Sequence, residues 1–255
     1  MKSPYKCRPA HGVSSRLREW YRRSLGKSLF EEERDQLVRI LANLFGYHLL
    51  QAGFHDNDEF ISSSRIPHRM VLVSDTDGPQ QSTTLQGTAR ALPFDAESLD
   101  LVLLPHTLEY EEDVHAVIRE VDRVLVPEGH LVIAGFNPYS LWGVWRILIG
   151  WLGIIPWCGK FISHWRIGDW MSLMGFDVIE VHKLYYRPPV NQQKILQKLS
   201  FMETIGRRVW PFFGAVYILV ARKRVTTITL IRPRWSLKKR LITAGIAGPT
   251  TKGTQ

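Results

Sequence analysis

Cysteine is scarce in this sequence, whose 255 residues include only Cys7 and Cys158. Two cysteines cannot form a disulfide framework, and their spacing matches no zinc-binding pattern, so we expect no metal site. We therefore expect a reducing, cytoplasmic setting. The basic residues at the start are not followed by an apolar core, which argues against a secretory signal.

Acidic residues are scarce at the two ends of the chain. Residues 1–30 hold eight basic residues and one acidic residue, Glu19, and residues 221–255 hold nine basic residues and no acidic one. Because the whole chain carries +9, residues 31–220 carry −7. The negative charge of this middle part argues against a nucleic-acid partner for it, although the basic ends leave such binding open.

These shifts in charge and composition predict three parts. Residues 1–30 form a basic arm and helix, residues 31–225 form one α/β domain, and residues 226–255 form a basic, disordered tail. The domain carries two insertions, an apolar one at 140–160 and a helical one at 190–209. With 45% hydrophobic residues, the chain can bury the core that one such domain needs.

Two helices are expected before the first strand. Ser15–Ser24 forms a basic helix that Leu25-Gly26 interrupts, and a second helix runs from Glu31 to Phe45. The second helix begins with three acidic residues, which the helix dipole favours at that end.

The clearest secondary-structure pattern lies between Ala91 and Asn137. Residues 99–104 are apolar except for Asp100, a run that is typical of a strand buried on both faces of a parallel sheet. Residues 111–125 repeat apolar side chains every three or four positions, which predicts an amphipathic helix, and residues 130–134 form a second buried strand. A strand, a helix and a parallel strand in this order form a right-handed crossover, so the sequence predicts an α/β fold.

Two motifs in this region resemble a known family. LPFDAESLDLVLL at 92–104 and REVDRVLVPEGHLVI at 119–133 are similar to the fourth and fifth strands of class I S-adenosylmethionine-dependent methyltransferases, in the type-11 branch. The resemblance implies a Rossmann-like fold with a mostly parallel central sheet, an antiparallel final strand and helices on both faces. It also implies S-adenosylmethionine as the cofactor.

The resemblance places the first cofactor-binding loop after residue 50. The family's strand-loop pattern V-L-D-x-G-x-G-x-G puts Gln51 where the acidic residue stands and Gly53 on the first glycine, while His55 and Asn57 replace the later glycines. Glycine lets the backbone approach the cofactor because it has no Cβ. The alternative is that Gly53 only ends a core strand.

Three further residues are candidates for the cofactor site. Asp75 lies 22 positions after Gly53, close to the offset of about 20 at which an acidic residue binds the ribose hydroxyls. The alternative is a turn aspartate, because Asp75 opens the turn sequence DTDGP. The resemblance also places Thr88 and Ala89 where the family has an acidic residue and an alanine near adenine.

Pro105 and His106 follow the strand at 99–104, at the end where open α/β sheets bind ligands. The resemblance places both residues at the methyl-transfer face. His106 is the candidate catalytic residue, because a neutral imidazole can accept a proton near neutral pH. The alternative is that His106 caps the strand, since the sequence shows no partner carboxylate.

The apolar insertion has two interpretations. Residues 141–157, LWGVWRILIGWLGIIPW, are interrupted by Arg146 and Pro156, so they lack the run of about 20 apolar residues that a transmembrane helix needs. The favoured prediction is a buried lid over the active-site cleft. The alternative is an element that inserts shallowly in a bilayer and, with the basic ends, holds the protein at the inner face of a membrane.

These observations support two hypotheses for function. The first is S-adenosylmethionine-dependent methyl transfer to an apolar small molecule. The second is a catalytically degenerate binding or regulatory protein that docks on membrane or nucleic acid through its basic ends, which the altered glycine loop and Thr88 favour. A nicotinamide-dependent oxidoreductase explains the spacing from Gly53 to Asp75, but it does not explain the two motifs at 92–104 and 119–133.

Overall fold

The computed structural model describes residues 13–53, 58–73, 84–192, 198–199, 201–210 and 212–224, with Gly248 and Gly253. The chain divides into two units, Met1–Val225 and Thr226–Gln255. The expected tail lies outside the described residues apart from the two glycines, and the start of the expected N-terminal arm also lies outside them.

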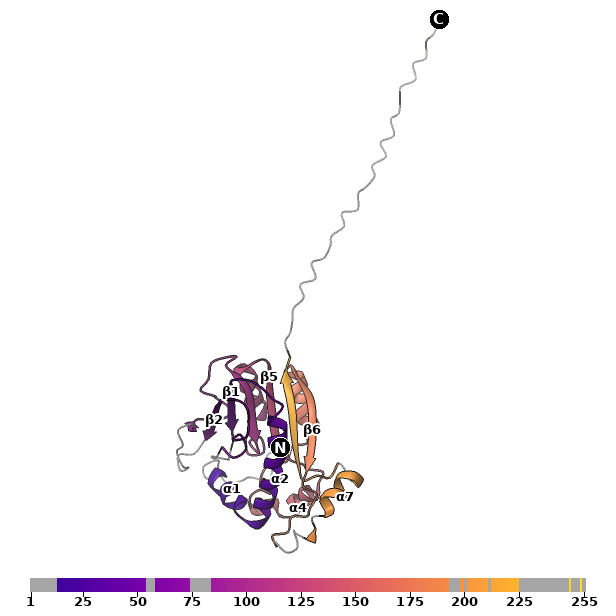
Figure 1. The fold of residues 1–255 in the computed structure, drawn as a ribbon. Coiled ribbons are helices and arrows are strands. Elements are labelled where there is room, and N and C mark those ends of the chain that lie inside the picture. Colours follow the sequence, from indigo (N-terminus) through magenta and orange to yellow (C-terminus); the bar gives the residue numbers. More distant parts are fainter. Residues whose placement is uncertain are drawn as a thin grey trace. The chain divides into compact units, whose positions relative to one another are not determined.

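A seven-stranded sheet in the order β3-β2-β1-β4-β5-β7-β6 forms the centre of the first unit (Figure 1). Strands β1 to β5 pair in parallel, whereas β7 is antiparallel to both of its neighbours, β5 and β6. The prediction of a mostly parallel sheet with an antiparallel final strand is confirmed. The strands are β1 (His48–Ala52), β2 (His68–Val73), β3 (Thr84–Gln86), β4 (Leu99–Pro105), β5 (Leu125–Phe136), β6 (Phe176–Leu184) and β7 (Val216–Lys223).

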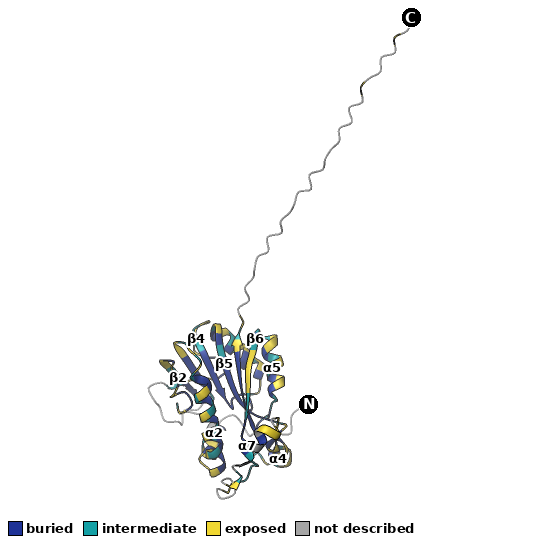
Figure 2. Cartoon of the chain, turned by 45° about the vertical axis from the view of Figure 1, so that its right-hand side comes forward, coloured by how far each residue is buried: buried dark blue, intermediate teal, exposed yellow. Residues whose placement is uncertain are grey.

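Helices cover both faces of the sheet, as expected (Figures 1 and 2). Because successive side chains of a strand point to opposite faces, Leu49 and Leu101 pack in one core with α1 and α2, while Leu50 and Val102 pack in a second core with α3 and α5. The helices are α1 (Val13–Tyr21), α2 (Ser24–Leu41), α3 (Val114–Val124), α4 (Leu141–Ile149), the 3₁₀ helix η1 (Gly150–Leu152), α5 (His164–Leu173) and α7 (Phe201–Val209).

The predicted strand-helix-strand crossover between 99 and 134 is present, but the connection from α3 to β5 differs from the prediction. The Asp113 side chain caps α3 by accepting a hydrogen bond from Ala116 N at 3.0 Å. The predicted helix at 111–125 and strand at 130–134 leave a gap between them, where Pro127 and Gly129 would end the helix. These two residues lie instead within β5, which starts directly after α3 and whose pairing with β4 shifts register here.

The break between the first two helices lies earlier than the sequence predicts. It falls at Arg22-Arg23, so that α2 begins at Ser24 and the acidic residues 31–33 lie inside it. Gly26 does not interrupt a helix but lies within α2. A Cβ on Gly26 would lie 2.3 Å from Trp20 O and 2.6 Å from Tyr21 Cα, so the missing side chain allows α2 to pack against the end of α1.

The apolar insertion is mostly exposed before residue 155 and buried from 155 to 159. Ile155, Trp157 and Cys158 are buried. In α4 only Trp142 and Gly143 are buried. The prediction of a buried lid is therefore wrong for the part of the insertion that precedes residue 155.

Two helical glycines test the packing of α2 on α1. We expect Gly26→Ala to lower the free energy of unfolding by about 1–3 kcal/mol, because the added methyl group overpacks a backbone contact. The matched control is Gly168→Ala in α5, where a Cβ would meet only Val178 Cγ2 at 3.7 Å. We expect this variant to be as stable as the wild type or more stable by up to about 1 kcal/mol. Urea unfolding measures both changes, and equal effects of the two substitutions would contradict the packing argument.

Candidate functional site

The strand order reverses between β1 and β4, which pair in parallel at the centre of the sheet. Open α/β sheets bind ligands at such a point, in the crevice outside the carboxyl ends of the strands. The residues that leave these two strands are Gly53, after β1, and His106, after β4. These two residues begin the loops that border the candidate site, within the part of the chain that the structure describes.

Gly53 brings the loops after β1 and β4 into direct contact. A Cβ on Gly53 would lie 2.7 Å from Thr107 Oγ1 and 2.9 Å from Pro105 O. The Thr107 hydroxyl donates a hydrogen bond to the Ala52 carbonyl at 2.7 Å, which ties the two loops together. Only a glycine fits this junction without displacing one of the loops, so Gly53 does more than end a strand.

Gln51 lies at the centre of the sheet. It occupies β1 between Val71 of β2 and Leu103 of β4, and it is fully buried. The family's acidic residue would carry a charge at this place, whereas a glutamine amide is neutral. Pro105 is the last residue of β4 and pairs with Ala134 of β5.

Thr88 and Ala89 lie in a turn that follows β3. Ala91 N donates to Thr88 O at 3.0 Å, and Gly87 N donates to Val73 O at 3.1 Å, which places the turn beside the end of β2. Ala89 is buried and Thr88 is exposed. Asp75, together with His55 and Asn57, lies outside the described residues.

His106 is fully buried between two carboxylates. Its Nε2 lies 2.8 Å from Glu33 Oε1, and its Nδ1 lies 3.2 Å from Glu109 Oε1. Glu33 comes from the middle of α2, and Glu109 follows His106 by one helical turn's spacing. The Tyr21 hydroxyl donates a hydrogen bond to the other Glu33 oxygen at 3.3 Å. We call these four residues the His106 cluster.

The His106 cluster sets the protonation state of the imidazole. Burial by itself lowers the pKa of His106, but the carboxylates of Glu33 and Glu109 outweigh burial and raise this pKa from 6.5 to about 10. His106 is therefore an imidazolium at neutral pH, and both of its N–H groups donate to a carboxylate. In this state it has no lone pair that could accept a proton. Its role as a general base stays a prediction.

The cluster also holds an unusual backbone conformation. His106 has φ of 51°, in the left-handed region that few residues other than Gly, Asn, Asp and His adopt. Its backbone N–H donates to Ala134 O at 2.9 Å. Together these contacts fix the start of the loop after β4, in which Thr107 packs against Gly53.

The sequence did not identify Glu33, Glu109 or Thr107 as site residues. One signal for Glu33 was present, because it lies four positions from both Leu29 and Leu37 and so interrupts the apolar face of α2. Sequence alone offered no comparable signal for Glu109 or Thr107.

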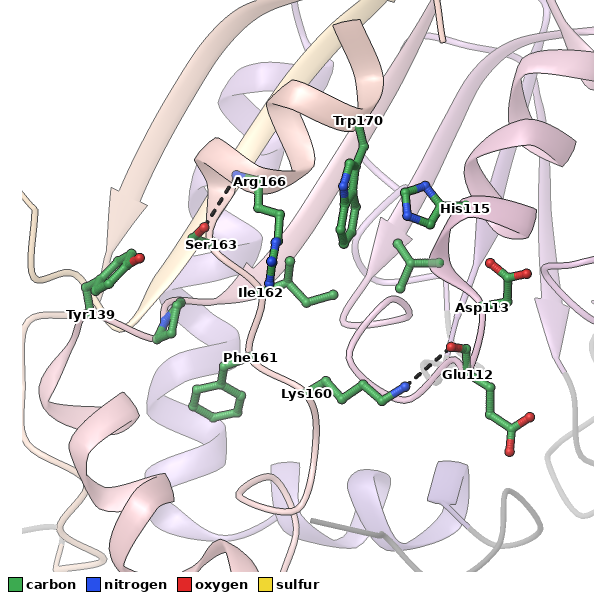
Figure 3. A pocket seen from close by; sticks show the side chains of 12 residues that line it. Glu112, Asp113, His115, Tyr139, Lys160, Phe161, Ile162, Ser163, Arg166 and Trp170 are labelled. Atoms are coloured by element: carbon green, nitrogen blue, oxygen red, sulfur yellow. Dashed lines mark hydrogen bonds between the residues drawn. The ribbon is translucent and has the colours of Figure 1, made fainter. Parts of the chain in front are cut away.

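A pocket of about 700 Å³ lies where α3 begins, after β5 and before α5 (Figure 3). It joins aromatic walls to charged groups of both signs. Lys160 Nζ donates to the carbonyls of Glu111 and Glu112 at 3.4 Å, and the ring centroids of His115 and Trp170 lie 4.4 Å apart. None of the predicted cofactor residues that the structure describes lines it. The lining residues are Glu112, Asp113, Val114, His115, Pro138, Tyr139, Lys160, Phe161, Ile162, Ser163, Arg166 and Trp170.

The chain is similar to several known proteins. A family model described as a methyltransferase domain matches residues 61–133. The uncharacterized protein YafS of Escherichia coli K12 is 31% identical over 195 residues, which is 76% of each chain. Malonyl-[acyl-carrier protein] O-methyltransferase of Halorhodospira halophila is 33% identical over 89 residues, which is 34% of this chain and 29% of that protein.

The fold is also similar to solved structures. An S-adenosylmethionine-dependent methyltransferase of Thermotoga maritima, described as a possible histamine N-methyltransferase, superimposes with a TM-score of 0.60. The match covers 84% of this chain and 99% of that one at 18% identity, so it shows the fold alone. This chain belongs to the class I S-adenosylmethionine-dependent methyltransferases of the type-11 branch, and S-adenosylmethionine is the cofactor of that family.

Proposed function

We propose that this protein transfers the methyl group of S-adenosylmethionine to a small molecule with an apolar body. The observation that carries the proposal is the contact of Gly53 with Pro105 and Thr107 at the reversal of strand order. A glycine is required there, at the place where folds of this class approach a nucleotide cofactor with bare backbone. The requirement for glycine and the reversal of strand order therefore point to the same place, the loop after β1.

The described residues fit such a cofactor. Because Gly53 has no side chain, the loop after β1 packs directly on the loop after β4, and this contact shapes the crevice in which the cofactor would lie. The turn with Thr88 and Ala89 lies beside Val73, the last residue of β2, and the predicted ribose-binding residue Asp75 follows Val73 by two positions in the sequence. Gln51 and Pro105 support these loops from within the sheet. The bound donor supplies an activated methyl group, so the chain has to align the acceptor and exclude water.

We infer that the pocket at the start of α3 receives the acceptor. Tyr139, Phe161 and Trp170 offer rings to an apolar body, while Lys160 and Arg166 can hold a polar or anionic group. The pocket lies outside the carboxyl ends of β4 and β5, on the same side of the sheet as Gly53. An acceptor bound there would lie next to the predicted cofactor loops.

We infer that the His106 cluster positions the loop after β4 rather than moving a proton. The imidazolium is buried, both of its nitrogens are occupied, and Thr107 directly follows it. Holding Thr107 against Ala52 keeps the crevice in shape. A buried charge with two hydrogen-bonded counter-charges is suited to this task, because breaking one pair is costly.

Titration calorimetry tests the cofactor site. We expect the wild type to bind S-adenosylmethionine and Gly53→Ala to bind it at least about ten times more weakly, since the methyl group displaces a loop that shapes the crevice. The control is Gly168→Ala, whose added methyl group finds ordinary contact distances. A folded wild type that releases no heat with S-adenosylmethionine would refute the proposal and would favour a protein that keeps the fold without the transfer.

The His106 cluster predicts a pH dependence of stability. The pKa of His106 is 6.5 when unfolded and about 10 when folded, so its charge stabilises the fold fully below pH 6.5. This contribution is lost as the pH rises through 10. We expect the wild type to lose stability between pH 7 and pH 10 by urea unfolding.

The variant His106→Asn isolates this contribution, because asparagine tolerates the positive φ but carries no charge. At pH 7 we expect it to be less stable than the wild type by about 3–5 kcal/mol, since two buried carboxylates lose their counter-charge. The difference should shrink toward pH 10. A difference that stays constant from pH 7 to pH 10 would show that the imidazolium is not the stabilising form.

A further inference from the structure

The first half of the apolar insertion forms an exposed ridge. Eight of its apolar side chains are between 43% and 70% exposed, with Trp151 the most exposed of them. Single exposed apolar residues are normal on a protein surface, but a continuous set is a mark of an interaction site. The eight residues are Leu141, Val144, Trp145, Ile147, Leu148, Trp151, Leu152 and Ile154.

The ridge continues onto neighbouring elements. The rings of Tyr139 and Trp165 lie 5.9 Å apart between centroids. Lys183 Nζ lies 5.8 Å from the Trp165 ring centroid and 4.6 Å from that of Phe212, so it joins the two aromatic residues. Trp210 and Phe213 are also more than half exposed. In both views α4 and α7 lie at the same end of the sheet (Figures 1 and 2).

We define the apolar end surface as the eight ridge residues together with Tyr139, Trp165, Trp210, Phe212 and Phe213. It contains four of the nine tryptophans of the chain. Tryptophan prefers the boundary between water and lipid, because its ring is apolar and its N–H is polar.

Several basic residues lie near the apolar end surface. From 137 to 168 the chain has no Asp or Glu but has Arg146, Lys160 and Arg166. The basic helix α1 contacts the apolar insertion, since the Arg16 guanidinium donates a hydrogen bond to Gly153 O at 2.8 Å. Arg16, Arg166 and Arg208 are exposed. The nearest carboxylate in sequence, Asp169, lies one helical turn beyond Trp165.

We propose that the apolar end surface docks this protein on the face of an anionic lipid bilayer. Apolar side chains would enter the boundary between headgroups and acyl chains, and the surrounding cations would meet lipid phosphates. Among the described residues no helix is long and apolar enough to cross a membrane, so the contact is interfacial. A second copy seated on this surface would instead bring two sets of cations together, which like-charge repulsion disfavours.

Vesicle flotation tests the proposal with the full chain. We expect the wild type to float with vesicles of phosphatidylcholine and phosphatidylglycerol, and to float less with phosphatidylcholine alone. The variant Leu148→Glu/Trp151→Glu should lose at least about tenfold in affinity, because two carboxylates would enter the apolar boundary. Both side chains are more than half exposed, so the fold should persist, and urea unfolding checks this.

The matched control is Leu173→Glu. Leu173 is 85% exposed but ends α5 at the opposite end of the sheet, where β6 begins. We expect its flotation to equal that of the wild type. Brominated lipids should quench the tryptophan fluorescence of the wild type and of this control, but not that of the double variant.

Two results would overturn the proposal. If the double variant floats as well as the wild type, the basic ends carry the lipid binding and the apolar end surface does not. If the wild type fails to float, and light scattering shows a dimer that the double variant dissociates, the surface is an interface between copies of this chain. Neither result bears on cofactor binding, which calorimetry measures separately.

Discussion

The interaction on which the candidate site depends is the ion pair between His106 and Glu33. It joins α2, which covers one face of the sheet, to the loop that leaves β4. That loop carries Thr107, whose hydroxyl holds the end of β1 and whose side chain leaves room only for glycine at position 53. One buried ion pair between residues 73 positions apart therefore lets α2 determine the shape of the loop after β4, and with it the shape of the crevice.

The two ends of the sheet have different surfaces. The carboxyl ends of β4 and β5 meet the pocket, the insertion and the apolar end surface, whereas residues such as Leu173 lie at the other end. Tyr139 belongs both to the pocket and to the apolar end surface. The place proposed for the acceptor and the place proposed for lipid contact thus share a residue. An apolar acceptor is consistent with both.

The sequence predicts the centre of the fold well because local patterns determine it. The apolar run at 99–104 and the periodicity before β5 can each be recognised in a short window, and both elements are present. The sequence also placed Gly53 in the loop after the first strand, but its contacts with Pro105 and Thr107 are known only from the structure. In contrast, the apolar composition of 141–154 suits a buried lid and an exposed surface equally, so only the structure could distinguish them.

Contacts between distant residues escaped the sequence for a physical reason. Glu33 and His106 are 73 residues apart, and nothing in the neighbourhood of either residue specifies the other. The acidic residues at 31–33 were expected to begin a helix, yet they lie within α2 because Gly26 lets that helix start earlier. Asp75 and the positions of the two missing loop glycines lie outside the described residues, so their predicted roles stay predictions.

The separation of Glu33 from His106 also has a consequence for the growing chain. During synthesis α2 leaves the ribosome well before the residue that neutralises its carboxylate, because domains are made from the N-terminus. Until then the charge of Glu33 stays hydrated and divides the apolar stripe formed by Leu29 and Leu37. The carboxylate that pairs with His106 in the folded protein therefore interrupts the apolar face of α2 while the chain is still being made. This reduces the continuous apolar surface that α2 exposes to other chains before it packs on the sheet.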